Sequence, residues 1–512
     1  MNPSHILARW AERTPNREAV IGVERRLTWA NLRKRVDELA VSLQGLGVKP
    51  GDRVGVLLYN CPEFLEAYFA ISHLGAIIVP INYRLAGPEF AYILDDAGVT
   101  VLITEAAFHS AIDPIQGKLS NLTHVVCVGE DVPAGWQSYE AAIESSGGGS
   151  VLAASSELDD VQRIMYTSGT TSRPKGAMIT HGNVYWKNVA HIMDLNLTAE
   201  DRTLIVGPLY HVGGLDLPAT GVLYMGGSVV ILPKFDAEHV LASVHEESAT
   251  NVWLAPTMIA QVLGREDIGR FDLSSLRIII DGGEKMPIPL IEKLLRIIPG
   301  CGFHDAYGLT ETVSGDTFLP PADAVPKTGS VGIPTHQLRL RIVDDERRDV
   351  APDELGEIIL RGPKIFAGYW NNPEATEAVL VDGWFHTGDI GRMDPEGYLY
   401  VVDRKKDIIV SGGENIASTE VERVIYEDPG VAECAVVGIP DERWGEVPWA
   451  YIVLKPGGET TADGIVDRCA AALARFKVPK RVEFIEALPR NPSGKVLKRA
   501  LREMAGPRDE GS

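Results

Sequence analysis

The chain has 512 residues, of which 45% are hydrophobic and 23% are charged. These proportions are typical of globular proteins and exclude a disordered or fibrous chain, and the length predicts at least two domains. Acidic residues outnumber basic ones by 70 to 49, which gives a formal net charge of −21 and argues against nucleic acid as a partner, because such binding needs a basic face.

The cysteines and the N-terminal residues indicate the cellular compartment that we expect for the protein. The five cysteines are widely spaced and form no Cys-x-x-Cys pair, which favours reduced structural cysteines over a zinc site or a disulfide framework. The chain begins Met-Asn-Pro-Ser-His-Ile-Leu-Ala-Arg-Trp, without an apolar segment of signal-peptide length, and contains no run of ~20 apolar residues. We therefore expect a cytoplasmic protein without a transmembrane segment.

Strand-like apolar runs alternate with helical patterns over the first half of the chain. This alternation predicts an α/β fold with mostly parallel sheets. The expected helices include residues 29–46 and 62–74. The expected strands are residues 54–58, 76–80, 101–104, 125–128, 163–167, 203–206, 228–232, 252–254 and 277–281.

From about residue 325 the pattern changes to short strands bounded by turns, which predicts a small β-rich layer over residues 338–402. The charged cluster at 403–407 follows, and after it we expect an α+β segment. Its elements are a helix over 418–426, strands near 433–439 and 450–454, and a helix over 462–473. We place the domain boundary in the charged cluster, with an N-terminal domain of residues 1–403 and a C-terminal domain of residues 404–512.

The first segment with chemical potential reads Tyr-Thr-Ser-Gly-Thr-Thr-Ser-Arg-Pro-Lys-Gly and covers residues 166–176. Small residues let backbone N–H groups converge on an anion, hydroxyls add donors, and Lys175 adds a positive charge. The spacing differs from that of a Walker A loop. A phosphate-binding loop is one interpretation, and a flexible polar loop is the other.

A second segment, His-Asp-Ala-Tyr-Gly-Leu-Thr-Glu-Thr at 304–312, places an aromatic ring, hydroxyls and carboxylates close together. These groups could stack on a base, bind phosphate and hold a hard cation. The alternative is an ordinary helix start capped by Thr310.

Two further segments carry single charged residues. Asp389 lies in a Gly-flanked segment that we expect to be a turn, where its carboxylate could accept ribose hydroxyls with Arg404 nearby. Lys495 follows a glycine in a Pro-punctuated loop near the C-terminus. Taken singly, Asp389 is more typical of an ordinary turn residue and Lys495 of a solvated surface lysine.

The order and spacing of the four segments resemble the adenylate-forming superfamily of acyl-CoA synthetases, peptide-synthetase adenylation domains and firefly luciferases. The resemblance covers almost the whole chain and is strongest to bacterial medium- and long-chain fatty acid and aryl acid CoA ligases. It implies a large N-terminal domain of layered α/β subdomains with a small β-rich subdomain, followed by a small mobile α+β domain. It also implies an acid–thiol ligase that uses ATP, Mg²⁺ and coenzyme A.

By this resemblance the polar loop closes over the β- and γ-phosphates, although Ser172 stands where the family usually has glycine. Tyr307 would stack on adenine with Asp305 at its edge, Thr310 would touch the α-phosphate, and Glu311 would hold Mg²⁺. Asp389 and Arg404 would bind the ribose. The implied nucleotide-binding residues are Thr167, Ser168, Gly169, Thr170, Thr171, Lys175, Gly282, Gly283, Glu284, Asp305, Ala306, Tyr307, Gly308, Thr310, Asp389, Arg404 and Lys495.

The resemblance also separates two half-reactions. Lys495 would be the adenylation lysine that bridges the carboxylate and the α-phosphate. Rotation of the C-terminal domain about a hinge at Lys406 would then bring the thiol tunnel into place. Ser411, Gly412 and Gly413 would line that tunnel. The implied catalytic residues are Lys495, Thr167, Glu311, His211 and Lys175, with His211 as the gate between the acyl pocket and the thiol channel.

The acyl pocket is expected around residues 210–217, 253–259, 282–286 and 306–314, which are rich in apolar side chains. An apolar pocket fits a monocarboxylic acid better than a dicarboxylate. Because Gly213 and Gly214 could leave room for a long chain, a medium- or long-chain fatty acid is the main expectation. The alternatives are a cinnamate- or benzoate-like aryl acid, loading of a carrier protein or another acceptor, and a non-catalytic nucleotide-binding scaffold. We also allow for a homodimer.

Overall fold

The computed structural model describes residues 2–167, 174–282, 286–405, 407–411, 414–441, 443–491 and 494–505. The chain packs as two compact units. The first unit comprises Met1–Leu340 and Leu360–Phe385, and the second comprises Arg341–Ile359 and His386–Ser512. The predicted domain boundary between residues 403 and 404 stays a prediction.

One sheet of the first unit has the strand order β7-β6-β5-β3-β4-β8-β9-β19. Its central strands pair in parallel, as the alternation of strands and helices predicts, whereas β8 and β9 form an antiparallel hairpin. The strands are β3 (Arg53–Leu57), β4 (Ile77–Pro80), β5 (Val99–Glu105), β6 (His124–Val128), β7 (Gln137–Ser138), β8 (Val161–Thr167), β9 (Lys175–Thr180) and β19 (Gly368–Tyr369).

A second sheet of the same unit has the order β16-β15-β14-β13-β12-β10-β11-β1-β2. The strands from β14 to β1 pair in parallel, and the outer strands are antiparallel. The strands are β1 (Glu18–Ile21), β2 (Arg26–Thr28), β10 (Arg202–Ile205), β11 (Ser228–Ile231), β12 (Asn251–Trp253), β13 (Ile278–Gly282), β14 (Gly302–Tyr307), β15 (Thr317–Phe318) and β16 (Ile333–Pro334).

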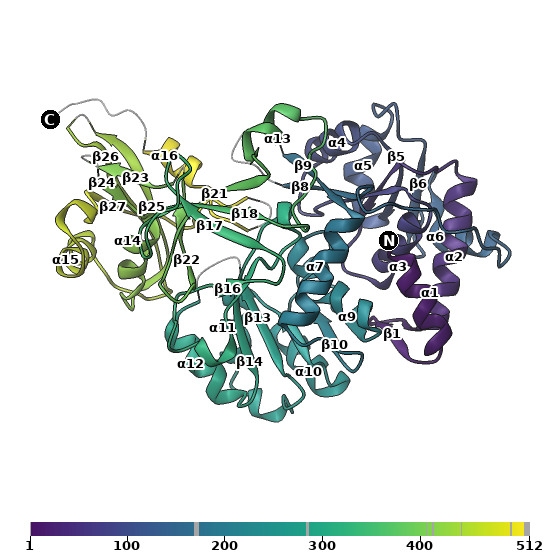
Figure 1. Ribbon diagram of the computed structural model, residues 1–512, viewed down its shortest axis with the longest axis horizontal. Helices are drawn as coiled ribbons and strands as arrows, with labels where there is room; N and C mark the ends of the chain where they lie inside the picture. The colour runs from purple at the N-terminus through teal and green to yellow at the C-terminus, as the bar shows by residue number, and fades with distance from the viewer. Residues whose placement is uncertain are drawn as a thin grey trace. The chain divides into compact units, whose positions relative to one another are not determined.

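Helices cover both faces of these sheets (Figure 1). This explains why the predicted strands are apolar throughout, since a parallel sheet buried on both faces needs apolar residues at every position. The helices are α1 (Ser4–Arg13), α2 (Trp29–Gly45), α3 (Pro62–His73), α4 (Gly87–Asp96), α5 (His109–Gln116), α6 (Tyr139–Ser145), α7 (His181–Asp194), α8 (Val212–Leu215), α9 (Ala219–Met225), α10 (Ala237–Glu247), α11 (Pro256–Leu263), α12 (Ile288–Ile297) and α13 (Pro373–Val379).

Alternate residues of each strand belong to different core layers, because successive side chains point to opposite faces of a sheet. In β11, Val229 and Ile231 pack with residues of α1, α2 and α3, whereas Val230 packs with residues of α10, α11 and α12. In β5, Val101 and Ile103 join the first of these layers, and the intervening Leu102 packs with α4 and α5. The helices α2 and α3 therefore lie between the two sheets.

The second unit is β-rich and then α+β, as the sequence predicts. Its long hairpin of β25 and β26 is buried on both faces: Val436 and Ile452 pack with α14 and α15, and Val437 and Tyr451 pack with α16. The elements of the chain from residue 339 onward, apart from β19 and α13, are β17 (Arg339–Val343), β18 (Gly356–Arg361), β20 (Leu380–Val381), β21 (Trp384–Met393), β22 (Leu399–Arg404), β23 (Ile409–Ser411), β24 (Glu414–Ile416), α14 (Ser418–Tyr426), β25 (Val431–Asp441), β26 (Gly445–Leu454), α15 (Ala462–Ala472), β27 (Arg481–Phe484) and α16 (Lys498–Met504).

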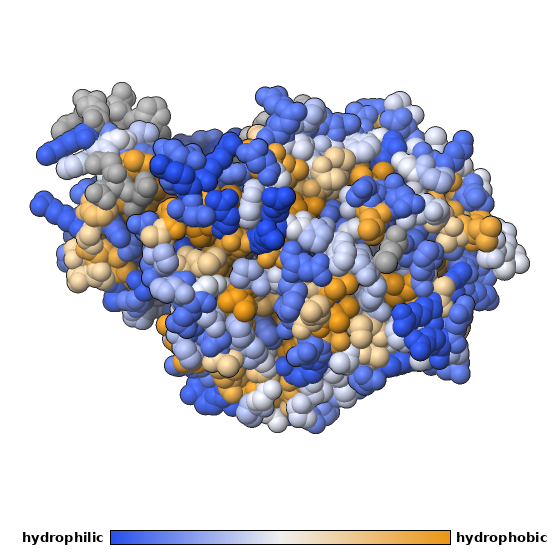
Figure 2. Space-filling model, viewed as in Figure 1, coloured by the Kyte–Doolittle hydropathy of each residue, from blue (hydrophilic) through white to orange (hydrophobic). Residues whose placement is uncertain are grey.

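Hydrophilic side chains dominate the face shown in Figure 2, and hydrophobic ones lie between them in smaller patches. Among the described residues, no helix is both long enough and apolar enough to cross a membrane.

Candidate active site

Most of the predicted site residues of the first unit follow the carboxyl ends of parallel strands. Because β12, β13 and β14 pair in parallel, Trp253, Gly282 and Tyr307 end their strands at the same edge of the second sheet. His211 follows β10, which is parallel to β12. The carboxyl edge of an open parallel sheet is where α/β proteins bind ligands, so the fold gathers these residues at one edge.

The predicted phosphate loop joins the two strands of the β8–β9 hairpin. Thr167 ends β8 directly opposite Lys175, the first residue of β9, and the Thr167 Oγ1 lies 3.5 Å from the Lys175 carbonyl oxygen. The two ends of the loop are therefore fixed by sheet pairing. Residues Ser168, Gly169, Thr170, Thr171 and Ser172 lie outside the described residues.

At two of the glycines predicted to bind the nucleotide, neighbouring backbone lies so close that no Cβ atom would fit. A Cβ atom on Gly282 would lie 2.8 Å from the Ala306 carbonyl oxygen of the neighbouring strand. A Cβ atom on Gly308 would lie 2.4 Å from the Gly315 backbone nitrogen. Any larger residue would separate these segments. Gly283 and Glu284 lie outside the described residues.

The loop after β14 carries Thr310 and Glu311 in a strained conformation. Thr310 starts a short 3₁₀ turn rather than the ordinary helix that was the alternative interpretation. Val313 and Ser314 follow with φ of 59° and 66°. A positive φ is unusual for a β-branched residue such as valine, and strain of this kind persists only where the surroundings fix the backbone.

Hydrogen bonds within the loop supply part of that constraint. The Thr312 hydroxyl donates to Asp316 Oδ2 over 2.6 Å and accepts from the Leu309 backbone N–H over 3.1 Å. The Asp316 N–H donates to the carbonyl oxygen of Tyr307 over 2.6 Å. The loop therefore closes on itself between Asp316 and Tyr307, the residue predicted to stack on adenine.

Lys364 completes the constraint from a distant part of the chain. Its Nζ lies 3.0 Å from Asp316 Oδ1 and donates to the carbonyl oxygens of Ser314 and Gly315 over 2.7 and 2.6 Å. Burial lowers the pKa of Lys364 and raises that of Asp316, because desolvation opposes both charges, and their contact offsets this. The contacts of Lys364 and Asp316 with the loop therefore hold the backbone around Glu311 in one conformation.

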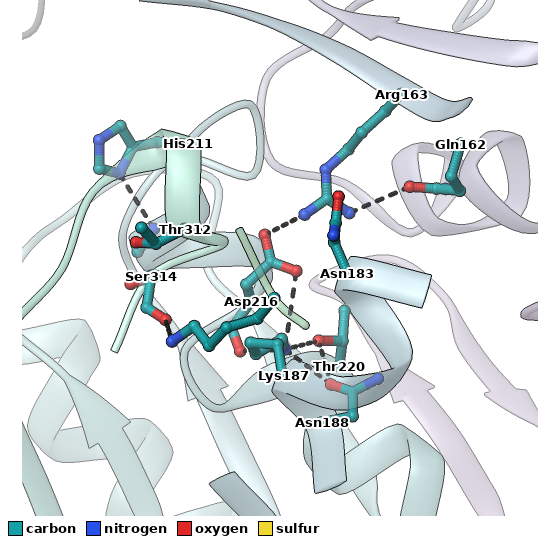
Figure 3. A network of polar contacts seen from close by, with 12 residues as sticks. Gln162, Arg163, Asn183, Lys187, Asn188, His211, Asp216, Thr220, Thr312 and Ser314 are labelled. Carbon is teal, nitrogen blue, oxygen red and sulfur yellow. Dashed lines mark hydrogen bonds and ion pairs between the residues drawn. The ribbon is translucent and has the colours of Figure 1, made fainter. Parts of the chain in front are cut away.

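A second buried ionic cluster holds the segment that carries His211 (Figure 3). Arg163 of β8 pairs with Asp216 over 2.6 Å. Lys187 of α7 donates to the Asp216 carbonyl oxygen, to Thr220 Oγ1 and to Asn188 Oδ1 over 2.9, 2.5 and 2.6 Å. Burial lowers the pKa of Lys187 to about 7. The cluster ties α7 to Asp216, which directly follows α8, and to Thr220 of α9.

His211 caps the N-terminus of the short helix α8, and its Nδ1 accepts a hydrogen bond from the Gly213 N–H over 3.0 Å. The two glycines after it do not provide open space. A Cβ on Gly213 would lie 3.2 Å from the Trp253 ring, and one on Gly214 would lie 2.3 Å from the Pro208 carbonyl oxygen. The expectation that these glycines leave room for a long chain is wrong, because an indole ring and backbone already fill the space.

Glu311 has the chemistry expected of a Mg²⁺ ligand. Its carboxylate is half-buried, and Oε1 accepts a hydrogen bond from the Tyr369 hydroxyl over 2.9 Å. A carboxylate has lone pairs on both oxygens, so it can accept this bond and still bind a cation. Mg²⁺ is usually bound through one or two carboxylates together with substrate phosphates, and Glu311 fits that pattern.

In the second unit, Asp389 and Arg404 form an ion pair of 2.7 Å between Oδ1 and Nε. Asp389 lies within strand β21 and is paired in register with Arg404 of β22, so the expectation that it occupies a turn is wrong. The alternation of the strand, not a loop, orients this buried carboxylate. The sequence missed the strand because glycines at 388 and 391 interrupt its apolar pattern.

The remaining predicted residues lie in loops of the second unit. Lys495 is exposed, in a loop closed by hydrogen bonds of 2.8 Å between Asn491 N–H and the Lys495 carbonyl and between Lys495 N–H and Asn491 Oδ1. Ser411 is buried at the end of β23. Lys406, Gly412 and Gly413 lie outside the described residues.

A glycine-lined strand edge and a carboxylate suited to Mg²⁺ are the features expected of an adenylating enzyme, and a comparison with family models identifies the class. The model of the AMP-binding enzyme family matches residues 7–370, and that of the AMP-binding enzyme C-terminal domain matches residues 420–495. The chain belongs to this family.

Relatives extend the identification to the reaction. The chain is 41% identical over 503 residues to indoleacetate–CoA ligase of Aromatoleum aromaticum, covering 97% of this chain and 98% of the relative. Two solved structures are also similar. One is an anthranilate CoA ligase with anthranoyl-AMP, at a TM-score of 0.91, 32% identity, and 99% and 97% coverage of the two chains. The other is O-succinylbenzoate coenzyme A synthetase of Bacillus subtilis with ATP and magnesium, at a TM-score of 0.86, 33% identity, and 97% and 99% coverage.

The protein is therefore an AMP-forming acid–thiol ligase that uses ATP, Mg²⁺ and coenzyme A. A carboxylate displaces pyrophosphate from ATP to give an acyl-adenylate. The thiol of coenzyme A then displaces AMP to give the thioester.

Proposed function

We propose that the acid is an aryl or arylalkyl carboxylic acid rather than a medium- or long-chain fatty acid. The packing of Trp253 carries this proposal. Trp253 ends β12 at the carboxyl edge, where its side chain is half-buried. The ring packs against Gly207 and Gly213, where added Cβ atoms would lie 2.5 and 3.2 Å from it, so an acyl group would contact the part of the ring that these glycines leave uncovered. A planar acyl group gains from such ring–ring contact.

The named relatives support the same choice over the fatty acid expected from the sequence. Indoleacetate, anthranilate and succinylbenzoate all carry an aromatic ring, and these are the acids in the names of the relatives described above. The aryl acid, which the sequence offers as an alternative, is the better supported reading.

For the adenylation step, we assign roles by combining the resemblance with the geometry. Lys175 and Thr167 bind the terminal phosphates, Tyr307 and Asp305 bind adenine, and Thr310 contacts the α-phosphate. Glu311 would hold Mg²⁺, which would supply positive charge beside the phosphates. Lys495 neutralises the carboxylate and the α-phosphate as one anion attacks the other, and this pre-arranged charge stabilises the transition state. The reaction is an in-line displacement, so positioning and electrostatics suffice.

For thioester formation, we propose that residues 404–512 rotate as a domain about Lys406 and that Lys495 withdraws. Ser411, Gly412 and Gly413 then line the thiol tunnel, and His211 forms its gate to the acyl pocket. Support comes from Asp407, which follows Lys406 and pairs with Arg502 of α16 over 2.8 Å, so that this flank would move with the C-terminal domain. Asp403, on the other flank, accepts a hydrogen bond from the Ser418 N–H over 2.8 Å, and the proposed rotation requires this bond to break.

We further propose that Asp389 accepts hydrogen bonds from the ribose hydroxyls and that Arg404 holds its carboxylate in place. The ion pair between Asp389 and Arg404 supports this, because a carboxylate held in one rotamer presents its lone pairs in a fixed direction. A cytoplasmic location and a homodimer remain predictions of the sequence. Light scattering on the purified protein tests the second.

The acid class is tested by measuring kcat/KM for thioester formation with benzoate-, cinnamate- and indoleacetate-like acids and with straight-chain acids of 6 to 16 carbons. We expect aryl acids to exceed every fatty acid by at least about tenfold, since one or two poorly fitted methylenes change kcat/KM by about 10–200-fold. Trp253→Ala should narrow this difference. A fatty acid that outperforms all aryl acids in the wild-type enzyme would overturn the proposal.

A further inference from the structure

Residues 366–370 link the phosphate-loop hairpin to the Glu311 loop. Strand β19 pairs with β9, and the backbone N–H groups of Ala367 and Trp370 donate to the carbonyl oxygens of Met178 and Gly176 over 2.9 and 2.7 Å. At the other end of the segment, the Phe366 N–H donates to the Glu311 carbonyl oxygen over 2.8 Å. One short segment therefore bonds to the backbone on both sides of the proposed ATP site.

The Tyr369 side chain makes the same link between functional groups. Its hydroxyl donates to Glu311 Oε1 over 2.9 Å, and its ring centroid lies 5.0 Å from Lys175 Nζ. Only 8% of Tyr369 is exposed, and its ring packs edge-on against Phe366 at 4.9 Å. One buried ring thus contacts both the proposed phosphate lysine and the proposed Mg²⁺ carboxylate.

The backbone before Tyr369 is specialised for this placement. Gly368 has a φ of 128°, and a Cβ atom there would lie 2.6 Å from Thr376 Cγ2. The Thr376 hydroxyl oxygen accepts a hydrogen bond from the Tyr369 N–H over 2.9 Å. Because glycine alone adopts this conformation easily, and because Thr376 fixes the next residue, the direction of the Tyr369 side chain is set by its own backbone.

We propose that Tyr369 is a positioning residue for adenylation, which sets the Glu311 carboxylate through its hydroxyl and the Lys175 ammonium through its ring. The proposal rests on the proposed roles of Glu311 and Lys175. A carboxylate that accepts a hydrogen bond at one oxygen loses rotational freedom, so its other lone pairs point in one direction. An ammonium over the face of an aromatic ring is attracted by the ring quadrupole, which favours one rotamer of a flexible side chain.

The two contacts can be separated by substitution. Tyr369→Phe keeps the ring and removes the bond to Glu311, whereas Tyr369→Leu removes both contacts. A purely structural tyrosine that only fills space would tolerate phenylalanine, because the buried ring is unchanged. The control is Tyr92→Phe, which also removes a tyrosine hydroxyl. That hydroxyl donates to the carbonyl oxygen of Pro174, the residue before Lys175, over 3.1 Å.

The test is calorimetric titration of ATP into the full-length enzyme without acid or coenzyme A, at a series of Mg²⁺ concentrations and without Mg²⁺. For Tyr369→Phe we expect the Mg²⁺ concentration that half-enhances ATP binding to rise about tenfold, as is typical when the partner of a metal-binding carboxylate is removed. ATP binding without Mg²⁺ should be unchanged. For Tyr369→Leu, ATP binding without Mg²⁺ should weaken as well, and Tyr92→Phe should match the wild type in both measurements.

Glu311→Gln separates failure of this inference from failure of the assignment beneath it. If Glu311→Gln weakens the Mg²⁺ response and Tyr369→Phe does not, the positioning role is overturned and the assignment of Glu311 stands. If Glu311→Gln leaves the Mg²⁺ response unchanged, Glu311 is not the Mg²⁺ ligand, and both statements fail. If Tyr92→Phe weakens the response as much as Tyr369→Phe, the effect is not specific to the Glu311 contact and the inference also fails.

Discussion

The loop after β14 and the loop that carries Lys495 hold groups for the same proposed step in opposite ways. The first is strained at Val313 and is fixed by Asp316 and by the buried Lys364. The second exposes Lys495 and is closed mainly by hydrogen bonds to Asn491 within the same loop. In the proposed scheme, the loop after β14 keeps its place in both half-reactions, whereas Lys495 acts in adenylation only. Lys495 accordingly lies on an exposed loop, which Arg490 also ties to Glu433 of β25 over 3.0 Å.

The largest expected effect comes from removing the fixed support. Lys364→Met leaves Asp316 buried without its cation, and breaking a buried pair in this way costs about 3–5 kcal/mol of unfolding free energy. Urea unfolding followed by tryptophan fluorescence measures the change. The exposed Lys118→Met is the control, with an expected change within about 0.5 kcal/mol. Equal stability of the two variants would show that Lys364 does not hold the loop.

The next effect is on catalysis rather than on stability. Lys495→Ala should lower the rate of pyrophosphate release by about 10²–10³-fold, as for the loss of one pre-arranged charged or donor group. It should leave thioester formation from supplied acyl-adenylate within a fewfold of wild type, with unchanged stability because the side chain is exposed. Lys480→Ala, another exposed lysine of the second unit, is the control. If Lys495→Ala slowed both steps equally, Lys495 would not be specific to adenylation.

A hinge variant should show the reverse pattern. Lys406→Pro fixes φ at the proposed hinge, so it should slow thioester formation by about 10²-fold through misplacement of the thiol while adenylation continues. Stopped-flow assays of each half-reaction measure this. Loss of adenylation alone would contradict the assignment of Lys406 as a hinge.

The free energy of unfolding should also depend on pH, because a histidine is buried in β14. Burial lowers the pKa of His304 from 6.5 to about 4. As the pH falls, His304 is therefore protonated near pH 6.5 in the unfolded chain but only near pH 4 in the folded protein. The contribution of neutral His304 to the free energy of unfolding is fully present above pH 6.5. It is lost as the pH falls towards 4, by about 3 kcal/mol.

His304→Gln should flatten this part of the curve of unfolding free energy against pH. His109→Gln, at a partly exposed histidine of α5, is the control variant. An unaltered slope in His304→Gln would show that this histidine is not buried in its neutral form.

The smallest effect is expected at the ribose. Asp389→Asn should raise the KM for ATP about tenfold, corresponding to ~1.5 kcal/mol for hydrogen bonds to a charged group, with little change in kcat. Asp345→Asn, at an exposed aspartate paired with Lys405, should leave KM unchanged. A fall in kcat without a change in KM would assign Asp389 a different role.

Local patterns in the sequence predicted much of the fold. The helix expected over residues 418–426 coincides with α14, and the strand expected to end at Thr167 does so, because apolar periodicity and turn residues are local signals. Asp389 was misplaced in a turn, since its neighbouring glycines resemble turn residues although the segment pairs as a strand. Motif order pointed to the chemistry, but the proposal of an aryl acid depends in part on how Trp253 packs against glycines far away in the chain.

The supporting residues Lys364 and Tyr369 were not found from the sequence. Each acts through a partner some 50 or more positions away in the chain, and such pairing has no periodicity. The only local signals are a lysine within the otherwise apolar Gly-Pro-Lys-Ile-Phe segment at 362–366 and the Gly-Tyr pair at 368–369. Their meaning follows only from the structure, in which Lys364 and Tyr369 contact the loop after β14.

The most direct test of the account is pyrophosphate release by stoichiometric enzyme mixed with ATP, Mg²⁺ and an aryl acid, first without and then with coenzyme A. The account predicts a burst of one pyrophosphate per enzyme, followed by steady turnover to AMP and the aryl-CoA thioester only after coenzyme A is added. Steady turnover without coenzyme A, or no burst with any aryl acid while a fatty acid gives one, would contradict it.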